Sequence, residues 1–166
     1  MELRNLLIRT AFSSMACDGN IDVKELEMVK GFILRDGLCE PDALESELNK
    51  LVQEFNADGV HFLETFLTQL RSASMSEAEQ IQVLRYAIEI VKADEVIDYC
   101  EIKFCKTIRA FLSVTDERII SSLGDVSEFL ERDISSRSYL ESIKNNLSFM
   151  ERLPNVSVTE VEDDES

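Results

Sequence analysis

Apolar side chains recur every three or four residues through most of the first 123 positions, which is the spacing of one face of an α-helix. No segment shows the strict alternation of apolar and polar residues that a half-buried β-strand requires. The chain also has only 5 glycines and 2 prolines, too few for a fold built on many tight turns. This pattern predicts an all-α protein.

Capping residues predict where several helices begin and end. Asp22, Ser76 and Thr115 are expected N-caps, Pro41 suits the first turn of a helix, and Gly37 is expected to end one in the left-handed conformation. The expected helices cover residues 2–16, about 22–36, a third from 41, a fourth after 58, a fifth after 76, about 98–112, and a short one after 115.

The pattern changes after residue 123. Residues 1–123 are predicted to form one helical domain. Residues 124–153 contain further apolar residues and are expected to form a partly helical extension. Residues 154–166 are polar and acidic with no basic residue, so a disordered tail is expected there.

The net charge limits the possible partners. With 33 acidic and 17 basic residues, the chain carries a formal charge of −16. Such a charge argues against binding nucleic acid or anionic membrane surfaces and favours cations or basic proteins. No apolar run approaches the ~20 residues that span a bilayer, so direct membrane insertion is not expected.

Cysteine and histidine usage points to a reduced protein without a zinc site. The four cysteines form no C-x-x-C pair, and a single histidine does not complete a Cys/His zinc set. The charged N-terminus has no cleavage-site pattern, so it does not resemble a signal peptide. We therefore expect a cytoplasmic protein whose cysteines mostly fill the core.

An internal repeat is the most specific motif in the chain. Residues 18–25 and 94–101 both fit D-x-x-I-D-x-x-E, and apolar positions on either side correspond as well. This predicts two copies of a helix, a short loop and a helix, packed as tandem hairpins about a pseudo-twofold axis. The acidic residues of the two motifs are Asp18, Asp22, Glu25, Asp94, Asp98 and Glu101.

These acidic residues have two interpretations. Asp22 followed by Glu25 suits a capping box, and the second loop repeats the same spacing. Capping does not explain Asp18 or Asp94, since each follows the end of a helix, where the dipole disfavours a carboxylate. A turn hydrogen bond or a shared cation would explain them. If the loops converge, the six carboxylates suit Ca²⁺ or Mg²⁺, which prefer oxygen ligands. Capping alone and capping with cation binding both remain open.

Both loops resemble those of the tellurite-resistance TerB-like family, which has A-D-G-x-I-D-x-x-E loops. The resemblance rests on residues 15–25 and 91–101 and covers about residues 1–123. It implies an all-helical fold of tandem hairpins and a cytoplasmic module tied to stress response, with protein partners, some near the membrane. By position, the family's proposed metal ligands are the same six acidic residues. Cys17 stands in place of the family's usual Ala, and Glu95 replaces the second loop's Gly, so that turn is not expected to adopt a positive φ.

No residue pattern predicts catalysis. His61 has no second histidine or poised nucleophile to accompany it, and the chain has no glycine-rich phosphate loop. We therefore expect no catalytic residues and no cofactor other than a cation. The leading hypothesis is a non-enzymatic binding module whose two loops hold Ca²⁺ or Mg²⁺. The alternative is a protein-interaction scaffold whose acidic loops serve only as helix caps.

Overall fold

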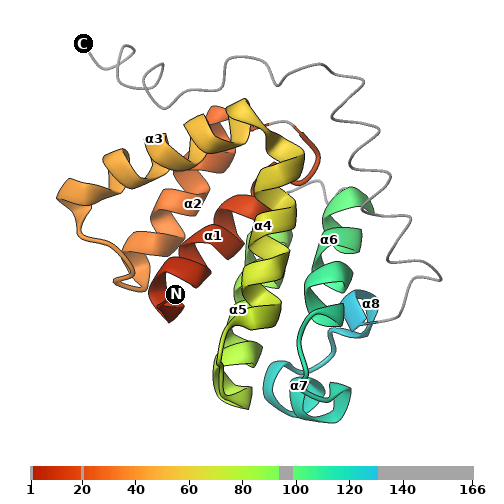
Figure 1. Cartoon of the computed structure of the whole chain (residues 1–166). Coiled ribbons are helices and arrows are strands. Elements are labelled where there is room, and N and C mark those ends of the chain that lie inside the picture. The colour runs from red at the N-terminus through yellow and green to blue at the C-terminus, as the bar shows by residue number, and fades with distance from the viewer. Residues whose placement is uncertain (1, 20, 94–98, 131–166) are drawn as a thin grey trace.

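The computed structural model describes residues 2–19, 21–93 and 99–130, and the described residues form helices joined by short connections, with no strand among them (Figure 1). The all-α prediction is therefore confirmed. The helices are α1 (Leu3–Ala16), α2 (Val23–Arg35), α3 (Pro41–Ala57), α4 (Gly59–Ser72), α5 (Glu77–Ala93), α6 (Tyr99–Ala110), α7 (Asp116–Leu123) and α8 (Ser127–Leu130). None of these helices combines the length and apolar character that crossing a membrane requires.

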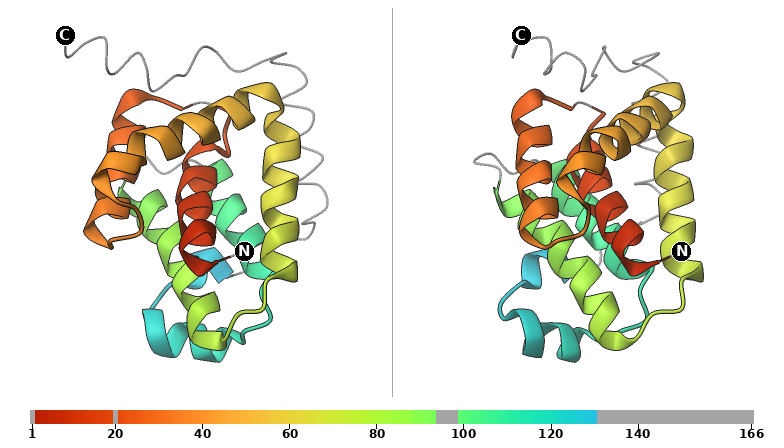
Figure 2. Two further views of the ribbon diagram at one scale, coloured as in Figure 1. Left: turned by 60° about the vertical axis from the view of Figure 1, so that its left-hand side comes forward. Right: turned by 90° about the vertical axis from the view of Figure 1, so that its left-hand side faces the viewer.

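Helix α1 lies at the centre of the molecule. It packs most extensively on α5 and also contacts α2, α4 and α6 (Figures 1 and 2). Because neighbours surround it, even its polar residues Thr10, Ser13 and Ser14 are buried. The ring of Phe12 meets Phe55 of α3 and Phe62 of α4 edge to face, with centroids 6.1 and 5.5 Å away. The first helix thus anchors the core.

The predicted end of α2 is confirmed. Gly37 has a φ of 63°, and Leu38 N donates a hydrogen bond to Ile33 O at 3.0 Å, which is the contact of a left-handed helix terminus. Leu38 is buried, so the chain folds back onto the last turn. Pro41 then occupies the first turn of α3, as its fixed φ favours.

Two further predicted N-caps are also formed. At the start of α5, Glu79 N donates to Ser76 Oγ at 3.2 Å, and Ser76 N donates to Glu79 Oε1 at 3.0 Å. This is a complete capping box. At the start of α7, Arg118 N donates to Thr115 Oγ1 at 3.4 Å. Each helix therefore begins where the side chain of its cap residue accepts a hydrogen bond from a backbone N–H group that has no partner within the helix.

The first residues of the predicted extension join the core. Val126, Phe129 and Leu130 are buried, and α8 packs on α6 (Figure 1). The remainder of the extension and the acidic tail lie outside the described residues. α1 packs on α2, and α5 packs on α6, as the predicted hairpins require. The internal duplication itself stays a prediction.

Candidate functional site

The first acidic loop is a tight turn between α1 and α2. Gly19 has a φ of 85°, and its N–H donates to Ala16 O at 2.9 Å. A residue with a side chain rarely adopts this conformation, so glycine is needed here. Ile21 is buried and fixes the far side of the turn to the core.

Asp22 and Glu25 form the predicted capping box. Asp22 Oδ1 accepts a hydrogen bond from Glu25 N at 2.8 Å, and Glu25 Oε2 accepts one from Asp22 N at 3.1 Å. The capping interpretation is therefore confirmed for the first loop. One oxygen of each carboxylate is thus bonded to a backbone N–H group of the cap.

Asp18 and Glu101 both act on the thiol of Cys17. The pKa of this thiol is raised well above its ordinary value, first by its hydrogen bond with the Cys100 side chain, then by burial, and further by the charges of Cys100, Asp18 and Glu101. Asp18 follows Cys17 and Glu101 follows Cys100, whose Sγ lies 3.4 Å from Cys17 O, so the two predicted hairpins bring these acidic positions to the same part of the molecule. Glu101 is only 4% exposed, which is unusual for an acidic side chain.

The described residues do not form a complete metal site. Asp94 and Asp98 lie outside the described part of the chain. Within that part, no group of three or more His, Cys, Asp or Glu side chains is placed to hold a metal ion. The four described candidates, Asp18, Asp22, Glu25 and Glu101, therefore do not make a site by themselves. Their oxygen donors are of the kind that Ca²⁺ and Mg²⁺ prefer.

The sequence analysis did not predict the contact between Cys17 and Cys100. Cys100 Sγ donates to Cys17 O at 3.4 Å, which links the end of α1 to the first turn of α6. Figure 1 shows both of these helix ends at the same end of the molecule. The repeat gave no signal for this pair, because the positions equivalent to Cys17 and Cys100 hold Ala93 and Lys24.

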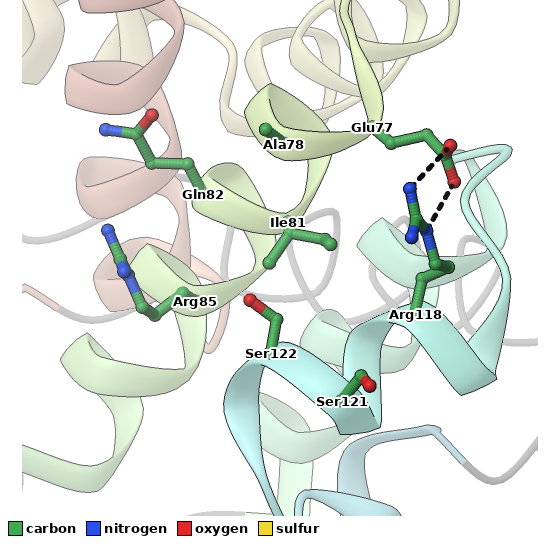
Figure 3. A pocket seen from close by; sticks show the side chains of 8 residues that line it. All are labelled: Glu77, Ala78, Ile81, Gln82, Arg85, Arg118, Ser121 and Ser122. Carbon is green, nitrogen blue, oxygen red and sulfur yellow. Dashed lines mark hydrogen bonds and ion pairs between the residues drawn. The ribbon is translucent and has the colours of Figure 1, made fainter.

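A groove of about 490 Å³ lies between α5 and α7, and it too was not predicted (Figure 3). Arg118 closes one side through an ion pair with Glu77, with Arg118 Nη2 3.3 Å from Glu77 Oε1. Arg85 lies on the other side of the groove, where its Nε is 3.6 Å from Glu89 Oε1. The remaining lining residues are Ala78, Ile81, Gln82, Ser121 and Ser122. The groove thus combines a small apolar floor with basic and hydroxyl side chains.

A comparison with known protein families finds a match over most of the described chain. The family model described as "Tellurite resistance protein TerB" matches residues 6–122. This range runs from α1 to α7 and includes both acidic loops. Neither the curated proteins nor the solved structures gave a significant match.

Proposed function

The chain belongs to the TerB family of tellurite resistance proteins, and on that basis we propose that it is a non-enzymatic binding module that holds a divalent cation between its two acidic loops. The single observation that carries the proposal is the contact of Cys100 Sγ with Cys17 O at 3.4 Å, which brings together the chain segments that contain Asp18 and Glu101. These carboxylates come from different hairpins, and each loop contributes further acidic residues in the sequence.

The chemistry of the donors selects the ion. Six carboxylates without histidine suit Ca²⁺ or Mg²⁺ rather than zinc. Asp18 and Asp94 are the acidic residues that the capping pattern in the sequence does not explain, so we propose that they are direct ligands. Asp22, Glu25, Asp98 and Glu101 would complete the set of ligands. A bound cation would also offset the mutual repulsion of these carboxylates.

Cation binding would stabilise the contact between the hairpins. A ligand that binds only the folded state raises stability by mass action. The acidic surface would then bind protein partners. We propose that these partners are basic or membrane-associated cytoplasmic proteins that act in a stress response. The charge of −16 supports partners of opposite charge.

Calorimetric titration of Ca²⁺ and of Mg²⁺ into the EDTA-stripped full chain tests the proposal. We expect saturable heat with at least one ion and a melting temperature that rises with ion concentration. The double substitution Asp18→Asn and Asp94→Asn should abolish both effects, because it removes the ligands that capping does not explain. Asp42→Asn, an exposed acidic residue in the first turn of α3, is the matched control and should leave binding unchanged. Absence of heat and of any thermal shift with both ions would contradict the proposal.

A second candidate is a protein-interaction scaffold whose loops act only as caps. The complete capping box at Asp22 and Glu25 favours it, since this box needs no ion. The groove between α5 and α7 would then be the binding surface. Under this alternative the same titration gives no heat, and the unsubstituted protein melts at the same temperature with and without Ca²⁺ or Mg²⁺.

A further inference from the structure

We propose that Cys17 and Cys100 are a covalent modification site, at which oxidation forms an intrachain disulfide between the end of α1 and the start of α6. Neither cysteine forms a disulfide in the structure. Cys100 Sγ donates a hydrogen bond to Cys17 O at 3.4 Å, which places the Cys100 thiol beside Cys17. This inference is independent of the proposed cation site.

The contact meets one requirement for a disulfide, which is the close approach of the two chain segments. Two cysteines can be bridged only when their backbones are close and their side chains point toward each other. The hydrogen bond from Cys100 Sγ to Cys17 O places the Cys100 side chain against the backbone of Cys17, whereas Cys17 Sγ donates to Ser14 O at 3.3 Å and has to turn toward Cys100. The sulfurs then need to approach to ~2.05 Å, which a side-chain rotation and a small shift of the first turn of α6 would provide.

The other two cysteines lie elsewhere. Cys39 is in the connection between α2 and α3, where its Sγ donates to Glu40 O at 3.5 Å. Cys105 is fully buried on α6. Among the described cysteines, Cys17 and Cys100 are the two that a hydrogen bond joins, so they are the pair that we expect to react.

Cys100 is the expected first site of oxidation, because it is half-buried whereas Cys17 is only 3% exposed. Hydrogen peroxide oxidises the Cys100 thiol to a sulfenic acid and is reduced to one water molecule. The Cys17 sulfur then attacks the Cys100 sulfur. The S–S bond forms as the S–O bond breaks, and the hydroxide takes the Cys17 proton and leaves as a second water. Overall, two thiols lose two electrons and two protons to one peroxide. A dithiol reductant reverses the reaction by exchange.

The bond would join residues that are 83 positions apart in the chain. Closing so long a loop removes much freedom from the unfolded chain, so the oxidised protein should be more stable than the reduced one. The bond would also fix Asp18 and Glu101 beside one another, because each follows one of the two cysteines in sequence.

Treating the full chain with stoichiometric hydrogen peroxide in EDTA tests this inference, and the EDTA keeps the result separate from cation binding. We expect a monomer whose mass falls by two hydrogen atoms and in which two of the four thiols no longer react with a maleimide. Peptide mapping without reductant should find Cys17 linked to Cys100. The melting temperature should rise by about 5–10 °C and return to its original value with dithiothreitol.

Single substitutions provide the controls. Cys17→Ala and Cys100→Ala should each abolish the linked peptide and the thermal shift, while the matched variant Cys39→Ala should retain both. Cys100 is half-buried, so its variant keeps the test decisive if Cys17→Ala fails to fold. Dimers linked through Cys39, or over-oxidised Cys100 beside a free Cys17 thiol, would overturn the inference. So would a cross-link that persists in Cys100→Ala.

Discussion

At the scale of single residues, Gln80 of α5 holds the connection between α6 and α7. Its Oε1 accepts hydrogen bonds from Ser113 N at 2.8 Å and from Val114 N at 3.0 Å, and its Nε2 donates to Ser113 Oγ at 3.1 Å. The side chain is only 8% exposed. One buried amide thus satisfies two backbone donors that no helix can satisfy.

Gln80→Leu should therefore destabilise the protein by about 2–3 kcal/mol, because it keeps the volume but leaves the N–H groups of Ser113 and Val114 without an acceptor. Urea denaturation at constant m-value would measure the loss. Gln53→Leu is the same change at an exposed position of α3 and should alter stability by no more than about 0.5 kcal/mol. Equal effects at the two positions would show that the amide contributes nothing specific.

The residues of the candidate site show which contacts a sequence can predict. Asp22 and Glu25 are three positions apart, so their capping box follows from local spacing. The contact of Cys17 with Cys100 joins residues 83 positions apart. It depends on how α1 and α6 pack, and helical periodicity carries no information on that. The approach of Glu101 to Cys17 is non-local in the same way.

At the scale of helices, the backbone conformation requires glycine at one position near the end of α2 but not at another position within α2. Gly37 ends α2 with a φ of 63°, which a residue with a Cβ adopts at a cost. Gly31 lies within α2, and a Cβ built there meets no atom within 4 Å. Glycine is therefore needed at the first position and weakens the helix at the second.

Gly37→Ala should lower the free energy of unfolding by about 1 kcal/mol, since alanine is strained in the left-handed conformation. Gly31→Ala should raise it by about 0.5–1 kcal/mol, because alanine favours the helix and restricts the unfolded chain. Thermal melting of the two variants, compared with that of the original protein, tests the direction of both changes in stability. A stabilised Gly37→Ala variant would contradict the assigned helix end.

Helix ends were predictable where a cap marks them and less so elsewhere. Ser76, Thr115 and Gly37 were all placed correctly, because each acts on backbone groups within a few residues. The end of α6 was expected near Leu112, but the helix ends at Ala110. Phe111 N and Leu112 N bond to carbonyls three residues earlier, so the last turn tightens without a cap residue to signal it.

At the scale of the whole molecule, the arrangement of the helices follows from which of them is buried on all sides. α1 carries buried residues around its full circumference, so other helices must enclose it. The sequence predicted one apolar stripe on this helix and thus gave no indication of its central place. Periodicity identifies a buried face, whereas the partners of that face depend on the volumes and lengths of every other helix.

The C-terminal boundary of the folded unit is also a property of the whole molecule. Phe129 is completely buried, and the ammonium of Lys92 lies 5.7 Å from its ring centroid, so residues beyond 123 complete the core. Phe129→Ala should therefore destabilise the protein by about 3–4 kcal/mol, as expected when a large cavity opens in a core. Ile120→Ala, at a side chain that is 46% exposed on α7, should cost under about 1 kcal/mol. Chemical denaturation of both variants makes the comparison. A loss at Phe129 no larger than that at Ile120 would mean that α8 is an appendage, and that the domain ends at α7.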